Sequence, residues 1–227
     1  MKFLIQTINN KVRHDFSFTL LESIEYQNWI RNDKSFKVRF TNEKTYPDYV
    51  PIGSVEFVSK YLYDYYKLTP KPINIPTELI DKYYTGRNII NGTEKDITGE
   101  KFVKSNDTFK SFAEICTSAP EGNYQISDII NIDSEWRSFV YKGKLVGLQN
   151  YSGDFEIFPN VSKIKEMIEA YKQQPISFTL DVAITNNNTI VMEVHDFFSC
   201  GLYGFSDHKI LPFMFSKWFH SFINKTD

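Results

Sequence analysis

Apolar and polar residues alternate most regularly between residues 177 and 204, where two runs typical of β-strands flank the turn Asn186-Asn187-Asn188. An asparagine-rich turn between two such runs predicts a β-hairpin. Every second side chain of a strand points to the same face. One face is therefore predicted to cover a core with its apolar residues, Phe178, Leu180, Val182, Ile184, Ile190, Met192 and Val194. The opposite face would carry Asp181, Ala183, Thr185, Thr189, Val191, Glu193 and His195.

The register of this hairpin decides whether its polar face forms a site. We expect Thr185 to pair with Thr189 across a three-residue loop. That register places Asp181 opposite Glu193, with His195 one step beyond. Directly opposed side chains have Cβ atoms roughly 5 Å apart, so two carboxylates repel each other there unless a positive charge lies between them. A hard cation with oxygen ligands would remove this repulsion.

Two alternatives to such a site stay open. A two-residue loop would place Val194 opposite Asp181 and dissolve the site, although it would also bury Glu193 in the apolar row. The second alternative is a surface hairpin whose outer face is acidic and binds nothing.

The other patterns predict a mixture of strands and helices. Short runs of strand-forming residues predict strands at 3–7, 37–40, 50–52, 86–90, 101–104, 124–130, 134–141 and 145–148. Residues 16–31 are mixed and predict a strand followed by a short helix. Apolar residues at helical spacing predict helices at 54–65, with Ser54 as N-cap, and at 77–83, 161–171 and 211–223.

A proline-rich run at residues 69–76 interrupts these elements. Prolines at such density exclude a helix and are typical of an extended connector. We therefore expect a domain boundary there, with residues 1–75 before it and residues 76–227 after it.

Composition and charge exclude several classes of protein. The chain has 227 residues and a net charge of −2. It therefore lacks the excess of positive charge that attracts nucleic acid. No apolar stretch of this sequence is long enough to span a membrane, and we expect no signal peptide. The two cysteines, Cys116 and Cys200, follow no metal or redox spacing. We expect a cytoplasmic protein with neither nucleic-acid nor membrane partners.

Residues suited to phosphate chemistry occur in a fixed order. Lys104 and Lys110 come first, and lysines neutralise phosphate charge. Arg137 follows in the triplet Glu135-Trp136-Arg137, and an arginine can clamp a transferring phosphoryl group. The acidic hairpin comes last, and Mg²⁺ prefers one or two carboxylates together with substrate phosphates. Alternatively, Arg137 pairs with Glu135 on an exposed strand face, and the lysines are solvated.

The order of these motifs resembles the ATP-grasp superfamily, in particular the small ATP-grasp proteins of bacteria and their phages. The resemblance covers roughly residues 50 to 218 and is carried by FVK, K-x-F, SEWRSFV, LDVAI, MEVHD and GLYG, together with the upstream PIGSVEF and Gly86-Arg87. It implies an α+β fold in which two α+β subdomains, 76–130 and 131–227, clasp ATP. A small α/β pre-ATP-grasp domain, residues 1–75, would precede them.

The resemblance also implies roles for individual residues. Lys104 and Lys110 would contact phosphates, and Arg137 would face the transferred phosphate. The adenine would meet the backbone near Asp128, Ile129 and Ile130, and Glu135 would lie near the hinge and the ribose. Asp181 and Glu193 would bind Mg²⁺. These positions together are Lys104, Lys110, Asp128, Ile129, Ile130, Glu135, Arg137, Asp181 and Glu193.

His195 departs from the family pattern, which usually has asparagine at this position. Asparagine offers Mg²⁺ a neutral oxygen, whereas histidine offers a nitrogen better suited to Zn²⁺ or Mn²⁺. We count His195 among the metal ligands, with Mn²⁺ as an alternative to Mg²⁺. The other interpretations are that His195 contacts phosphate, or that Asp196 or a water takes the place of the asparagine.

The resemblance predicts an ATP-dependent ligase that joins a carboxylate to an amine, or to a thiol, through an acyl phosphate. Its partners would be ATP, a carboxylate and an amine, each a small molecule or a peptide. The first alternative is a nucleotide-binding or regulatory protein on the same fold that no longer ligates. The second is an α+β interaction module that binds no nucleotide.

Overall fold

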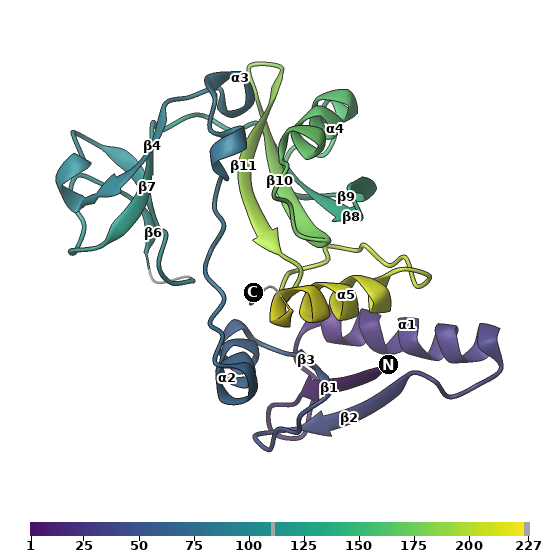
Figure 1. Ribbon diagram of the computed structural model, residues 1–227. Helices are drawn as coiled ribbons and strands as arrows, with labels where there is room; N and C mark the ends of the chain where they lie inside the picture. The colour runs from purple at the N-terminus through teal and green to yellow at the C-terminus, as the bar shows by residue number, and fades with distance from the viewer. Residues whose placement is uncertain (110–111, 225–227) are drawn as a thin grey trace. The chain divides into compact units, whose positions relative to one another are not determined.

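The computed structural model describes residues 1–109 and 112–224, and its chain forms two compact units (Figure 1). The first unit contains Met1–Pro70, Pro175–Ser177 and the segment from Phe197 onward. The second unit contains Lys71–Gln174 and Phe178–Asp196. Among the described residues, none of the helices has the length and apolar character needed to cross a membrane.

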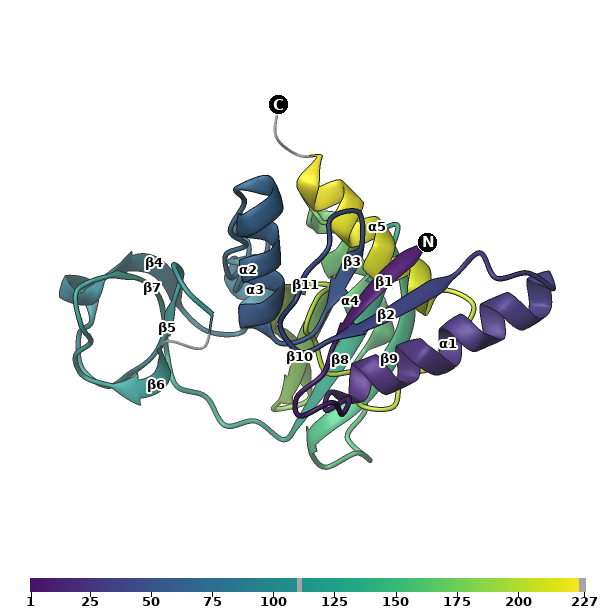
Figure 2. The ribbon, with the colours of Figure 1, turned by 90° about the horizontal axis from the view of Figure 1, so that it is seen from below.

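The first unit is a three-stranded parallel sheet with helices packed on it (Figure 2). Its strands, in the order β2-β1-β3, are β1 (Lys2–Gln6), β2 (Lys37–Thr41) and β3 (Val50–Ile52). Its helices are α1 (Asp15–Arg31), α2 (Val55–Tyr66) and α5 (Leu211–Ile223). The central strand β1 buries Phe3, Leu4 and Ile5 in succession, as expected for a strand covered on both faces. The predicted cap of α2 is confirmed, because the side chain of Ser54 accepts a hydrogen bond from the backbone N–H of Phe57.

The predicted strand and short helix at residues 16–31 are wrong, because this segment is one continuous helix, α1. The buried residues Phe16, Leu20 and Ile24 recur every fourth position. Phe18 and Trp29 are also apolar but exposed, so they obscured the helical period in the sequence.

The second unit contains two four-stranded sheets. The first sheet has the order β4-β7-β5-β6 and consists of β4 (Ile89–Thr93), β5 (Lys101–Ser105), β6 (Ala113–Cys116) and β7 (Asn123–Ser127). The short helical turn η2 (Glu94–Asp96) contacts this sheet, and the unit also contains the short helical segments η1 (Thr77–Leu79) and α3 (Lys82–Thr85). The predicted strand at 124–130 therefore ends at Ser127, and the predicted helix at 77–83 is two separate turns.

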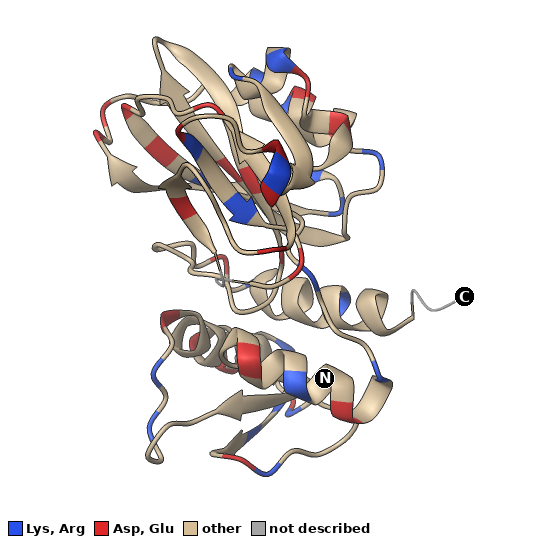
Figure 3. Ribbon diagram, turned by 90° about the vertical axis from the view of Figure 1, so that its left-hand side faces the viewer, with Lys and Arg blue, Asp and Glu red and all other residues tan. Residues whose placement is uncertain are grey.

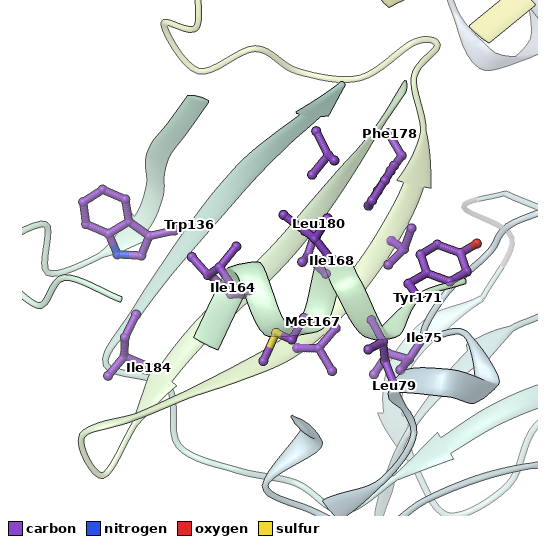
Figure 4. Packing of buried hydrophobic residues seen from close by; sticks show 14 residues of the cluster. Ile75, Leu79, Trp136, Ile164, Met167, Ile168, Tyr171, Phe178, Leu180 and Ile184 are labelled. Carbon is purple, nitrogen blue, oxygen red and sulfur yellow. The ribbon is translucent and has the colours of Figure 1, made fainter. Parts of the chain in front are cut away.

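The second sheet has the order β11-β10-β8-β9 and is covered by α4 (Figure 4). Its elements are β8 (Ser134–Tyr141), β9 (Lys144–Gly153), α4 (Val161–Ala170), β10 (Ser177–Thr185) and β11 (Asn188–Asp196). Ile164, Met167 and Ile168 of α4 pack against Leu180 and Trp136 of the sheet in one core cluster. The side chain of Asn160 caps α4 by accepting hydrogen bonds from two backbone N–H groups of its first turn.

The predicted hairpin forms, but its loop differs from the prediction. Thr185 pairs with Asn188, so the loop has two residues, Asn186 and Asn187, and the predicted three-residue loop is wrong. Both loop residues have positive φ, as a type I′ turn requires. A β-bulge then shifts the register between Asp181 and Val182, and Asp181 faces Glu193 as predicted.

The bulge also changes which residues of β11 face the core. Val182 pairs with Val191, and Ala183 pairs with Ile190, so Met192 is the extra residue opposite no partner. Val191 belongs to the core cluster, whereas the sequence placed it on the acidic face. Ile190 lies on the same face of the hairpin as Asp181, although the sequence placed it among the residues that face the core. The predicted alternation is correct along β10, whereas on β11 it is wrong between the turn and the bulge and correct beyond the bulge.

The proline-rich connector is extended, as expected, but part of it is buried. Asn74 is 1% exposed and forms an isolated antiparallel bridge with Val194 of β11. Ile75 belongs to the core cluster covered by α4. The expected division into residues 1–75, 76–130 and 131–227 stays a prediction.

Candidate active site

The acidic hairpin places three metal-ligating groups together. One ligand atom from each of Asp181, Glu193 and His195 lies within 4.8 Å of the other two. Asp181 comes from β10, and the other two come from β11. This arrangement depends on the bulge, since an uninterrupted ladder from the observed Asn186-Asn187 turn would have put Met192 opposite Asp181. The expectation that a two-residue loop places Val194 opposite Asp181 and dissolves the site is therefore wrong.

Arg137 is held by Asp181 rather than by its sequence neighbour Glu135. Its Nε donates to Oδ1 of Asp181 at 2.8 Å, and its Nη2 donates to Oδ2 at 2.7 Å. Both residues are buried, with Arg137 7% and Asp181 3% exposed. The interpretation of an exposed Arg137–Glu135 pair is therefore wrong. The guanidinium also lies over the ring of Tyr151, 5.7 Å from its centroid.

Lys104 of β5 forms an ion pair with Oε1 of Glu193, so the two sheets of the second unit meet at this contact. The other oxygen of Glu193, Oε2, lies 2.8 Å from Nε2 of His195. Burial opposes ionisation of Glu193, but hydrogen bonds and charge from His195 and Lys104 outweigh it and lower the pKa of this carboxyl to about 2. Glu193 is therefore a carboxylate at neutral pH.

The pKa of Glu135 is raised, whereas that of Glu193 is lowered. It lies on the same face of β8 as Arg137, and its side chain is half-buried. Burial and the nearby charge of Asp181 raise the pKa of Glu135. Figure 3 shows that the strands of this unit carry both basic and acidic positions.

A family model described as "ATP-grasp domain, R2K clade family 2" matches residues 84–212, more than half of the chain. The chain belongs to the ATP-grasp superfamily. The predicted membership and the predicted ATP-grasp fold are thereby confirmed, and binding of ATP follows from the family. The expected identity of residues 1–75 as a pre-ATP-grasp domain stays a prediction.

Solved structures of other ATP-grasp proteins share this fold. D-alanine–D-alanine ligase from Bacillus anthracis has a TM-score of 0.51 at 11% identity, covering 98% of this chain and 96% of that chain. The RimK domain protein ATP-grasp from Sphaerobacter thermophilus has a TM-score of 0.51 at 12% identity, covering 98% and 99%. The ATP-grasp ligase PsnB, solved with minimal precursor, Mg and ADP, has a TM-score of 0.53 at 9% identity, covering 96% of each chain. No curated protein matches the sequence.

The predicted adenine segment of this ATP-grasp protein follows β7. Asp128 accepts hydrogen bonds from Nζ of Lys101 at 2.7 Å and from Nδ2 of Asn88 at 2.7 Å. The hydrogen bonds from Lys101 and Asn88 lower the pKa of Asp128. Ile129 is 42% exposed, and Ile130 lines a pocket of about 370 Å³ beside the hairpin turn. Lys110, the second predicted phosphate contact, lies outside the described residues.

Three residues of this unit were not predicted from the sequence as part of the site. Lys101 stands three positions before Lys104 in the same strand, yet it pairs with Asp128. Gln125 pairs with Lys104 across the ladder. Arg87 is 6% exposed and donates to the carbonyl oxygen of Val191 at 3.2 Å, and burial lowers its pKa to about 10. The family pattern marked Arg87 without giving it a role, and nothing in the sequence pointed to Gln125.

The three ligating groups of this ATP-grasp protein fit a divalent cation by donor type, since two carboxylates and one imidazole are all common metal ligands. Both oxygens of Asp181 are, however, bonded to Arg137 in the structure, and both oxygens of Glu193 face Lys104 or His195. A cation bound here would therefore share or replace these partners.

Proposed function

We propose that this ATP-grasp protein is an ATP-dependent carboxylate–amine ligase that acts through an acyl phosphate. The observation that carries the proposal is that the two opposed acids of the hairpin, Asp181 and Glu193, are each paired with a cation from another strand. These four residues are Asp181 with Arg137 and Glu193 with Lys104. Such a cluster suits phosphoryl transfer, which depends on positioning and on charge neutralisation more than on covalent help.

In the proposed reaction, a carboxylate oxygen of the first substrate attacks the γ-phosphorus of ATP. The bond from that phosphorus to the β–γ bridging oxygen breaks, and ADP leaves with the electron pair. The nitrogen of the amine then attacks the acyl carbon, phosphate leaves, and the amine loses a proton. Lys104 would neutralise charge on the phosphates of ATP, and Arg137 would face the transferred phosphoryl group, since its fork donates in a fixed plane. Lys110 is proposed as a further phosphate contact.

A divalent cation would be held by Asp181, Glu193 and His195. When bound, Mg²⁺ or Mn²⁺ supplies further charge neutralisation to the phosphates. The adenine is proposed to bind at the backbone of Asp128, Ile129 and Ile130, and Glu135 beside the ribose. A cytoplasmic location, and a carboxylate and an amine that are small molecules or peptides, belong to the same proposal.

A second candidate function is nucleotide binding without ligation. The observation that favours it is His195, because its imidazole stands where the family pattern has a neutral oxygen. With both acids already neutralised by protein cations, such a protein could bind ATP as a regulatory ligand.

Phosphate release separates the two functions. The protein is incubated with ATP, Mg²⁺ or Mn²⁺, and pools of carboxylates and amines. The ligase predicts phosphate release that requires both a carboxylate and an amine, whereas ATP binding without release in every pool would support the regulator. Asp181→Asn with Glu193→Gln should abolish turnover, and the exposed Glu169→Gln is the matched control. Retained turnover in the double variant would contradict the proposed mechanism.

A further inference from the structure

Asn74 of the connector is bonded to the neighbours of both Lys104 and Glu193. Its backbone carbonyl accepts a hydrogen bond from the N–H of Val194, the residue after Glu193, at 2.7 Å. Its side-chain Nδ2 donates to the carbonyl oxygen of Ser105, the residue after Lys104, at 2.9 Å. One buried residue thus links the two strands that carry the ion pair.

The residue after Asn74 strengthens this link. The backbone N–H and carbonyl of Ile75 are both bonded by the side-chain amide of Gln125, at 3.1 and 3.0 Å. Gln125 is the ladder partner of Lys104 on β7. The side chain of Ile75 packs in the core beneath the acidic hairpin. The connector is therefore fixed to the lysine strand by polar contacts and to the hairpin sheet by apolar contacts.

The conformation of Asn74 suits this position. Its φ is +54°, in the left-handed region that asparagine tolerates better than most residues. The same amide group also donates to Oδ1 of Asn106 at 2.7 Å, so its donor nitrogen is fully engaged while the residue is 1% exposed. The two bonds of Nδ2 hold the amide in one orientation, because losing either would leave a buried donor unsatisfied, while Oδ1 is buried and has no hydrogen-bond partner among the described residues.

We infer that Asn74 is a positioning residue that sets Lys104 against Glu193, and that it thereby fixes the geometry of the proposed nucleotide site. The inference rests on the proposed function for its link to ATP, but the link to the ion pair rests on geometry alone. A connector that would otherwise serve as a flexible joint instead holds the spacing between the phosphate-binding lysine and the acidic pair.

The decisive experiment is a double-mutant cycle of the Lys104–Glu193 ion pair, in which the stability of each variant is measured by urea unfolding without nucleotide. In the natural sequence, Lys104→Met and Glu193→Gln should shift the urea midpoint by less together than the sum of their separate shifts. In an Asn74→Gly background the shifts should become additive. Glycine adopts positive φ without strain, so this change removes the amide and keeps the backbone. If the two shifts are as far from additive in the Asn74→Gly background as in the natural sequence, the inference is overturned.

Asn187→Gly is the matched control, because Asn187 is an exposed turn residue with φ of +62°. It should leave the non-additivity unchanged. If Asn74→Gly fails to fold, Asn106→Ala removes one of the two acceptors of the same amide and should reduce the non-additivity in part; no reduction would count against the inference.

ATP binding with Mn²⁺ provides the second readout. In the natural sequence, Asn74→Gly should weaken ATP binding at least fivefold. In a protein that already carries Lys104→Met, adding Asn74→Gly should not weaken ATP binding beyond the level of Lys104→Met alone. A further loss in that combination would show that Asn74 acts by another route and would overturn the inference. Absence of ATP binding by the natural sequence would overturn the proposed function alone, because the unfolding cycle measures the ion pair without nucleotide.

Discussion

Arg137 and Asp181, 44 positions apart in the chain, form a buried bidentate ion pair with N–O distances of 2.8 and 2.7 Å. Two parallel N–H···O bonds fix the plane of the guanidinium relative to the carboxylate. The pair therefore fixes the orientation of the arginine that we propose for the transferred phosphoryl group. It also means that neither residue can be replaced alone without leaving a buried charge.

The first prediction concerns the stability of this pair. Asp181→Ala should lower the free energy of unfolding by about 3–5 kcal/mol, because Arg137 would remain buried without its carboxylate. The combined change Arg137→Met with Asp181→Leu should recover most of this loss, since an apolar pair carries no desolvation penalty. Urea unfolding measures both, with Glu169→Ala as an exposed control. A small effect of Asp181→Ala would show that the pair is not buried in solution.

The second prediction concerns the choice of metal. His195→Asn should lower the preference for Mn²⁺ over Mg²⁺ by roughly tenfold, because a nitrogen ligand favours later divalent metals and an amide oxygen suits Mg²⁺. Binding of Mn²⁺ is followed by electron paramagnetic resonance, with Mg²⁺ as competitor. His220→Asn, a change on α5 of the first unit, is the control. An unchanged preference would remove His195 from the ligand set.

The third prediction concerns competition between Lys104 and the cation. Lys104→Met should raise the affinity for Mn²⁺ in the absence of nucleotide by about tenfold, because the ammonium no longer neutralises Glu193 or repels the ion. The same change should weaken ATP binding. Lys101→Met, whose ammonium pairs with Asp128, should leave metal affinity unchanged. Equal metal affinity in all three proteins would contradict the placement of the cation at Glu193.

The fourth prediction concerns alkaline pH and lies in the first unit. Tyr61 is buried and donates its hydroxyl to the carbonyl oxygens of Tyr46 and Tyr49 at 2.9 and 2.8 Å. Burial raises the pKa of Tyr61 above its usual value of 10.0. A group whose pKa is higher in the folded state contributes stability below the unfolded pKa and loses it as the pH rises further. Stability should therefore fall above pH 10.

Tyr61→Phe tests this sign directly. At pH 8 the variant should be less stable by about 1 kcal/mol, because a buried hydrogen bond is lost. The difference from the natural sequence should shrink above pH 10, by up to about 1.4 kcal/mol per pH unit. Urea unfolding between pH 8 and 11 measures it, with the exposed Tyr63→Phe as control. A difference that does not change with pH would contradict the raised pKa.

The sequence by itself determined the local elements and the chemistry they carry. Ser54 indicated the start of α2, and regular apolar spacing indicated α4 and α5. The alternation of the hairpin brought Asp181 and Glu193 together as candidate ligands. These features follow from short-range periodicity and capping, which depend on residues a few positions apart.

Only the tertiary structure decided how these residues are connected. The bulge at Met192 restored the Asp181–Glu193 pair after a turn one residue shorter than expected, and it lets Val191 before it and Val194 beyond it both pack in the core. The sheet order placed β8 beside β10 and gave Arg137 its partner. In the sequence, Asn74 looked like part of a plain connector. Its hydrogen-bond partners, Ser105 and Val194, are far from it along the chain, so no local sequence pattern could reveal these contacts.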